Sequence, residues 1–119
     1  MPLVFYGIPN CDSVKRARAW LGEHGVVHVF HDFKKDGVPA ARLEAWIAAV
    51  GWQALINRQG TTWRKLDVAA QAGVVDATGA SALMQAQPSV IKRPVVEWAS
   101  DTVTVGFDAG RWAALLERQ

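Results

Sequence analysis

The single cysteine of this chain, Cys11, lies where a sulfur can act as a nucleophile. The apolar residues 3–7 are typical of a strand, and residues 14–21 are typical of a helix for which Asp12 and Ser13 are good starting residues. A sulfur in the loop between them faces the unsatisfied backbone N–H groups and the positive dipole end of the helix. Both favour the thiolate, so Cys11 is predicted to have a pKa below the free value of about 8.5.

Two considerations oppose a reactive Cys11. Asp12 adds a like charge beside the sulfur unless its carboxylate turns away to cap the helix. A lone cysteine is also often a small apolar side chain that fills space in a core. The strand–loop–helix context favours the reactive thiol instead. Because the sequence holds one cysteine, no internal disulfide can form, and a redox cycle needs a thiol from another molecule.

Length and composition indicate one cytoplasmic domain. A chain of 119 residues, half of them apolar, is long enough for a real core, and we assign residues 1–119 to a single domain. The N-terminal region lacks the features of a signal peptide, and no apolar stretch approaches the ~20 residues needed to span a bilayer. We therefore expect a cytoplasmic protein without a membrane partner. A net charge of +2 is too small to indicate nucleic-acid binding.

The first third of the chain predicts a βαβ unit. Residues 26–31 follow the helix and are rich in β-branched and aromatic side chains, as expected of a second strand. A strand, a helix and a strand within about 30 residues form a right-handed unit with parallel strands. His28 and His31 lie three positions apart on that strand, so they face opposite sides of the sheet. They are interpreted as structural, and no metal site is predicted.

The middle of the chain is predicted to be helical, and its end to be a hairpin followed by a helix. Apolar residues recur at helical spacing from Leu43 to Val50, and Gly51 closes that helix. After this region, valines and Phe107 alternate with polar residues, which indicates a strand of a hairpin. The predicted elements are a turn at Asp36-Gly37, helices at 43–50 after Pro39 and at 52–56, a helix capped by Thr61 or Thr62 that contains Trp63, Leu66 and Ala70, a helix at 81–87, strands at 95–98 and 103–107 joined by a turn at Ser100-Asp101, and a last helix capped by Asp108.

Together these elements predict an α/β protein with a thioredoxin-like fold. Its four-stranded mixed sheet is flanked by helices, and a helical insertion at about 38–88 separates the core segments 1–33 and 89–119. In such a fold the loop after the first strand carries the reactive cysteine. Pro94 precedes the third strand, where a cis bond would bring Arg93 against the cysteine loop and an ordinary trans bond is the alternative.

Several cationic residues fall in or beside predicted loops. Most such residues are ordinary solvated surface, but a few that converge would form an anion site. The residues concerned are Lys34, Lys35, Arg58, Arg64, Lys65, Lys92 and Arg93.

Three separated blocks of this sequence resemble the arsenate reductase (ArsC) family, which includes the Spx regulators, and within it the YffB-like subgroup. The blocks are Tyr6-Gly7-Ile8-Pro9-Asn10-Cys11-Asp12, Leu55-Ile56-Asn57-Arg58 and Val90-Ile91-Lys92-Arg93-Pro94-Val95. A further segment resembles a signature of the subgroup itself, Gly60-Thr61-Thr62-Trp63-Arg64-Lys65-Leu66-Asp67. The resemblance spans nearly the whole chain, and the order of the blocks makes it specific.

The resemblance implies roles for individual residues. In glutaredoxin-coupled arsenate reductases a cysteine attacks arsenate, glutathione takes the arsenic adduct, and arginines hold the oxyanion. Cys11 matches the nucleophile, and Pro94 matches the family's cis-proline. Arg58 and Arg93 match two of the arginines, and Lys92 and Arg64 are further candidates for holding an anion.

Three features of the family are missing from this sequence. A third arginine is expected on the last strand, where the chain reads Val103-Thr104-Val105-Gly106. Gly7 replaces the histidine expected before the cysteine loop, and both losses weaken arsenate binding. The Cys-x-x-Cys switch of many Spx proteins is absent, because position 14 is Val14.

We therefore predict a glutathione-dependent thiol-disulfide reductase that works through a mixed disulfide on Cys11. It would bind no resident cofactor, use glutathione as co-substrate, and meet glutaredoxin or a protein disulfide as partner. Two alternatives stay open. One is a glutaredoxin-coupled arsenate reductase. The other is a non-enzymatic regulator, like Spx, that binds RNA polymerase and for which Cys11 would be dispensable.

Overall fold

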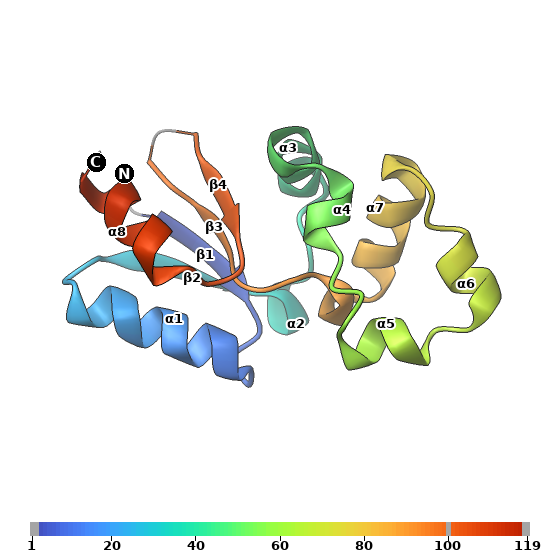
Figure 1. Ribbon diagram of the computed structural model, residues 1–119, viewed down its shortest axis with the longest axis horizontal. Coiled ribbons are helices and arrows are strands. Elements are labelled where there is room, and N and C mark those ends of the chain that lie inside the picture. The colour runs from blue at the N-terminus through green and yellow to red at the C-terminus, as the bar shows by residue number, and fades with distance from the viewer. Residues whose placement is uncertain (1–2, 100, 118–119) are drawn as a thin grey trace. The chain divides into compact units, whose positions relative to one another are not determined.

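The computed structural model describes residues 3–99 and 101–117. They form two compact units (Figure 1). The sheet unit consists of the residues up to 33 and those from 93 onward, and the helical unit consists of residues 34–92. The helical unit contains the whole of the predicted insertion. None of the helices within the described residues is long and apolar enough to cross a membrane.

The sheet unit contains the predicted four-stranded mixed sheet. The strand order is β2-β1-β3-β4, with β1 parallel to β2 and the other two pairs antiparallel. Both the βαβ unit and the C-terminal hairpin are therefore confirmed. The strands are β1 (Leu3–Gly7), β2 (His28–Asp32), β3 (Val95–Glu97) and β4 (Val103–Val105).

His28 and His31 of β2 face opposite sides of the sheet, as predicted from their spacing. His28 packs against Phe5, with ring centroids 5.5 Å apart, and His31 packs against Tyr6 at 5.0 Å. Phe5 and Tyr6 are neighbours on β1, and neighbouring side chains of a strand point to opposite faces. The Nε atom of Arg18 donates a hydrogen bond to Nε2 of His28 at 3.3 Å. These contacts agree with the predicted structural role of His28.

Helices α1 (Asp12–Glu23) and α8 (Ala109–Glu117) pack into one hydrophobic core with the sheet. Val14, Ala17 and Leu21 bury the inner face of α1, as their helical spacing predicts. Trp112 of α8 is fully buried and meets Phe5 edge to face. The predicted cap of α8 is confirmed, because Oδ1 of Asp108 accepts a hydrogen bond of 3.0 Å from the Arg111 N–H group. This core holds α1, and therefore the loop before it, against the sheet.

The first strand has the predicted bounds, and the bounds of the other three differ from the predicted ones by at most two residues. The second strand begins at His28 rather than at residue 26, and the hairpin strands end at Glu97 and Val105. Asp101 of the predicted turn has a positive φ of 61°, but Ser100 lies outside the described residues. Gly106 also has a positive φ, 85°, which ends β4 and makes its extension to Phe107 wrong.

The helical unit is built from short helices. Leu43 and Trp46 are fully buried on the longest of them, as their spacing predicts. The helices that follow β2 are α2 (Phe33–Asp36), α3 (Ala40–Val50), α4 (Trp52–Leu55), α5 (Thr61–Lys65), α6 (Val68–Ala72) and α7 (Ala77–Ala86), with a 3-10 turn η1 (Pro88–Val90) before β3.

Three predictions in this unit are wrong, two of them because of side-chain caps. The single helix expected through Trp63 and Ala70 is two helices, because Oδ1 of Asp67 accepts a hydrogen bond of 2.7 Å from Ala70 and starts α6. Helix α7 begins four residues before Ser81, because Asp76 caps it through a 2.8 Å bond from the Gly79 N–H group. The residues before the predicted turn at 36–37 form the short helix α2, which the sequence prediction missed.

Candidate active site

Cys11 occupies the N-cap position of α1, one residue earlier than the predicted helix start. Its backbone is extended, with φ −143° and ψ 126°, and its carbonyl oxygen accepts the Lys15 N–H group at 2.9 Å. The side chain is partly buried. Asp12 follows as the first helical residue and is exposed, so its carboxylate is screened by solvent. The sulfur is therefore at the amino end of the helix, where the sequence places it.

The surroundings of Cys11 lower its pKa below the ordinary value of a thiol. Partial burial acts in the opposite direction, because it disfavours the charged thiolate. The backbone N–H of Val14, the hydrogen bond and positive charge of Arg93, and the backbone N–H of Ser13 together outweigh that effect. Two groups therefore stabilise the thiolate form of Cys11. They are the backbone N–H groups in the first turn of α1 and the guanidinium group of Arg93, which is distant in sequence.

Arg93 lies immediately before β3, and the peptide bond between Arg93 and Pro94 is cis. The sequence left both a cis and a trans bond before Pro94 open. The structure has the cis bond, which the family resemblance implies. The carbonyl oxygen of Pro94 accepts the Gly106 N–H group at 2.8 Å, which ties the start of β3 to the end of β4. Because β3 pairs with β1, it delivers Arg93 to the end of β1 from which the Cys11 loop departs.

Two other predicted anion-binding residues meet in the helical unit. Arg58 and Lys92 line one pocket of about 320 Å³, together with the side chains of Gln53, Asn57 and Gln59. A bridge between Ile56 and Ile91 joins the two chain segments, supported by hydrogen bonds from Asn57 N–H to the Val90 carbonyl oxygen at 2.9 Å and from Lys92 N–H to the Leu55 carbonyl oxygen at 2.7 Å.

This pocket combines two positive charges with neutral hydrogen-bond donors. The sequence reasoning found Arg58 and Lys92 but missed the three amide side chains, although Asn57 lies in the family block that contains Arg58 and the two glutamines lie close to it in sequence. The guanidinium carbon of Arg58 lies 5.6 Å from the ring centroid of Trp63, which restricts its position. Arg64, the remaining candidate, is exposed on α5 and does not line this pocket.

Gly7 permits the close approach of β1 and α1 at the Cys11 loop. A Cβ atom at this position would lie 2.9 Å from Cγ2 of Val14, a side chain that is only 1% exposed. Gly7→Ala should therefore destabilise the protein by about 1–3 kcal/mol, the usual cost of overpacking a core. Urea unfolding would measure the loss.

Gly22→Ala is the matched control for this prediction. A Cβ at Gly22 would meet no atom within 4 Å, and the residue lies inside α1, so alanine should stabilise the protein by about 0.5–1 kcal/mol. Shortening Val14 to alanine in the Gly7→Ala background should recover part of the lost stability. Equal stability of the Gly7→Ala variant and the wild type would contradict the contact.

If glutathione is the anion that the sequence predicts, Arg58→Ala should weaken its binding about fivefold to tenfold, somewhat less than the usual effect of a hydrogen bond to a charged group, because Arg58 is exposed. Arg58→Lys should not restore the affinity fully, since lysine lacks the planar fork of donors. Titration calorimetry would measure both variants. Arg64→Ala is the control, because this arginine lies outside the pocket. Wild-type affinity in Arg58→Ala would remove the residue from anion binding.

Comparison with known proteins places the chain in a family. The model of the ArsC family matches residues 6–115. A solved structure of a YffB protein is 49% identical, with a TM-score of 0.90, and the match covers 96% of this chain and 98% of that one. A protein of Haemophilus influenzae is 38% identical over 112 residues, covering 94% of this chain and 96% of its own length.

A third comparison concerns a regulator. The global transcriptional regulator Spx of Streptococcus mutans is 27% identical over 115 residues, covering 92% of this chain and 80% of its own. The family match spans the Cys11 loop, the Arg58 segment and the segment of Arg93 and Pro94 together. With this match and its arsenate-reductase-like fold, the chain belongs to the ArsC family.

Proposed function

We propose that this protein is a thiol-disulfide reductase in which Cys11 forms a mixed disulfide with glutathione. The observation that carries the proposal is the environment of Cys11, where two backbone N–H groups and Arg93 lower the pKa of the chain's one thiol. A thiolate of this kind attacks a disulfide sulfur, whereas a protonated thiol does not. Because the chain has no second cysteine, the resolving thiol comes from another molecule.

The reaction has two exchange steps that balance. In the first, the Cys11 thiolate attacks the glutathionyl sulfur of a mixed disulfide, the old sulfur–sulfur bond breaks, and the substrate leaves as a thiolate that takes a proton from water. In the second, the thiolate of reduced glutathione attacks the sulfur of the Cys11 adduct. This releases oxidised glutathione and regenerates the Cys11 thiolate. Each cycle therefore consumes one reduced glutathione, whose sulfur ends in a disulfide with the glutathionyl sulfur taken from the substrate.

Glutathione suits the charges that the chain offers. The tripeptide carries two carboxylates, and cationic side chains recognise carboxylates through charged hydrogen bonds. Arg93 supplies a cation beside Cys11 for one of these carboxylates. The helical unit, taken by itself, offers a separate cationic pocket with Arg58 and Lys92. In this proposal glutathione is a co-substrate rather than a resident cofactor, and glutaredoxin or a protein disulfide is the reaction partner.

Mass spectrometry of the intact protein tests the proposal directly. Reduced protein incubated with oxidised glutathione should gain the mass of one glutathionyl group, and reduced glutathione in excess should remove it. Cys11→Ser is the control and should gain nothing. Protein that stays unmodified over a pH range in which its thiolate forms would rule out the mixed disulfide.

The likeness to Spx supports a second candidate function, a regulator that binds RNA polymerase without turnover. A separate measurement distinguishes it from the reductase. Pull-down of purified RNA polymerase with equal retention by the wild type and by Cys11→Ser, in a protein that forms no glutathione adduct, would favour the regulator. Failure of both proteins to retain the polymerase would leave the reductase as the supported function.

A further inference from the structure

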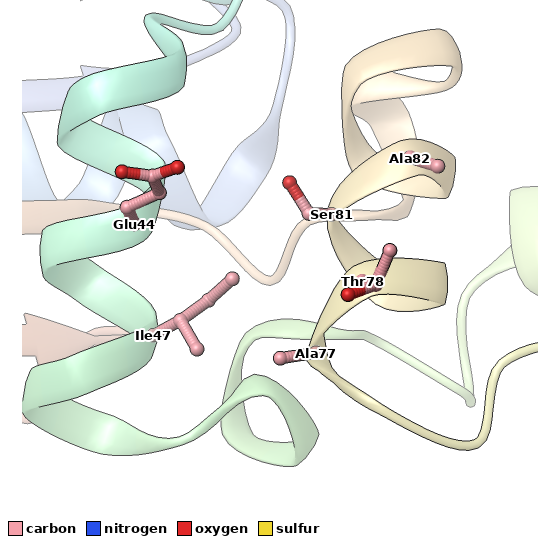
Figure 2. Close-up of a pocket in the computed structure, with 6 residues that line it drawn as sticks. All are labelled: Glu44, Ile47, Ala77, Thr78, Ser81 and Ala82. Atoms are coloured by element: carbon pink, nitrogen blue, oxygen red, sulfur yellow. The ribbon is translucent and has the colours of Figure 1, made fainter.

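A cleft between α3 and α7 of the helical unit has the volume of a small-molecule site. It encloses about 440 Å³, within the range of about 300–1,000 Å³ usual for ligand pockets. Trp46 of α3 and Met84 of α7 are fully buried and anchor the two helices. Figure 2 shows the residues that line the cleft, Glu44, Ile47, Ala77, Thr78, Ser81 and Ala82.

Three polar side chains face this cleft without a protein partner. Glu44 lies on α3, and the hydroxyl group of Ser81 points toward it from α7, with Thr78 one turn away (Figure 2). Within residues 3–99 and 101–117, none of the three is engaged in a side-chain hydrogen bond or an ion pair. Their hydrogen-bonding capacity is therefore available to a ligand.

The lining residues define the chemistry of that ligand. Glu44 is the one charged residue among them, so the cleft repels anions and favours a cation. No group of three His, Cys, Asp or Glu residues in the described parts of the chain is arranged to hold a metal ion. The remaining walls, Ile47, Ala77 and Ala82, are apolar. An organic cation with a hydrocarbon part fits this combination.

We propose that the α3–α7 cleft binds a small alkylammonium ligand. An ammonium group has three N–H donors, and the cleft presents three acceptors, the carboxylate of Glu44 and the hydroxyl oxygens of Thr78 and Ser81. The alkyl chain packs against Ile47 and the alanine side chains. This site is separate from the pocket of Arg58 and Lys92, with which it shares no lining residue.

A titration of the full-length protein with n-hexylammonium chloride, followed by ¹H–¹⁵N NMR, tests the site. The backbone amides of 44–47 and 77–82 should shift in a saturable manner. n-Hexanol and n-hexanoate carry the same hydrocarbon chain, so they separate the contribution of the charge. The ammonium should bind most tightly and the hexanoate least tightly. Equal shifts with hexanoate, or no saturable shifts at these amides, would overturn the proposal.

Two variants assign the charge to Glu44. Because this residue is exposed, Glu44→Gln should weaken n-hexylammonium binding about threefold to fivefold, the upper part of the range for solvent-exposed ion pairs. Glu44→Lys should abolish it, while both variants keep their affinity for n-hexanol. Glu23→Gln replaces an exposed helical glutamate outside the cleft and is the matched control. Unchanged ammonium affinity in Glu44→Lys would refute the site.

Discussion

With glutathione and glutaredoxin supplied, the purified protein is expected to form a glutathione adduct at Cys11 readily and to reduce arsenate slowly or not at all. Arsenate is multiply charged and must approach a thiolate, so its site needs several cations. The third arginine that the family resemblance leads us to expect on the last strand is absent. In β4 the central residue Thr104 is only 2% exposed, and its hydroxyl group accepts the indole N–H of Trp98 at 2.9 Å. This strand therefore supplies no cation.

The size of the effect follows from the missing contacts. Each lost hydrogen bond to a charged group costs about 1.5–3 kcal/mol, or roughly one to two powers of ten in transition-state binding. A glutathione disulfide needs fewer cations at the thiolate than arsenate does. It presents a neutral sulfur to the thiolate, and its carboxylates lie further away. Both assays should be run on one preparation, with Cys11→Ser as the blank. Vigorous arsenate turnover would contradict the expected preference for a disulfide over arsenate. It would show that Lys92, Arg64 or another cation replaces the lost arginine.

Removing the guanidinium group of Arg93 is expected to change the pH dependence of Cys11. In the wild type this group contributes a hydrogen bond and a positive charge that lower the pKa of the thiol. Arg93→Ala should therefore raise the pKa of Cys11, so that thiolate formation, followed by its ultraviolet absorbance, moves to higher pH. Arg93→Lys keeps the charge without the fork of donors and should lie between the two. Arg16→Ala, an exposed position on α1, is the control.

The reaction rates should change in opposite directions at low and high pH. Below both pKa values the variant has less thiolate, and although each thiolate is more nucleophilic, attack on a disulfide slows about threefold per pKa unit gained. Above both pKa values both thiols are fully ionised, and the more basic thiolate of Arg93→Ala should react faster by about the same factor. Hydroxyethyl disulfide, a neutral probe, measures this without charge effects on the substrate. Parallel pH–rate profiles of the two proteins would exclude Arg93 from activating Cys11.

Local sequence patterns determined the elements that carry the thiol. The apolar run of β1 and the helix-forming residues after Ser13 put Cys11 between a strand and a helix, and the structure has that arrangement. The same holds for the terminal hairpin and for the cap of α8 at Asp108. These features depend on backbone propensity and side-chain periodicity over a few residues, which a sequence displays directly.

Local patterns were insufficient where one side chain decides between two helical arrangements. Helical periodicity continues through Leu66, yet the carboxylate of Asp67 caps a new helix and ends the old one. Short polar residues compete with the backbone for hydrogen bonds, so they favour a cap over a helix interior. The periodicity of apolar residues does not report this competition, and the predicted boundaries were wrong there.

Contacts between distant residues were decided by the tertiary structure alone. Sequence similarity nominated Arg58, Arg64, Lys92 and Arg93 as one set, but strand pairing brings Arg93 to Cys11, and the bridge of Ile56 with Ile91 brings Arg58 to Lys92. Arg64 joins neither pair in the described structure. A residue's type and its neighbours in sequence state what chemistry it can do. Which partners it meets depends on chain segments that fold together from far apart, and that information lies in the packing of the sheet and the helices.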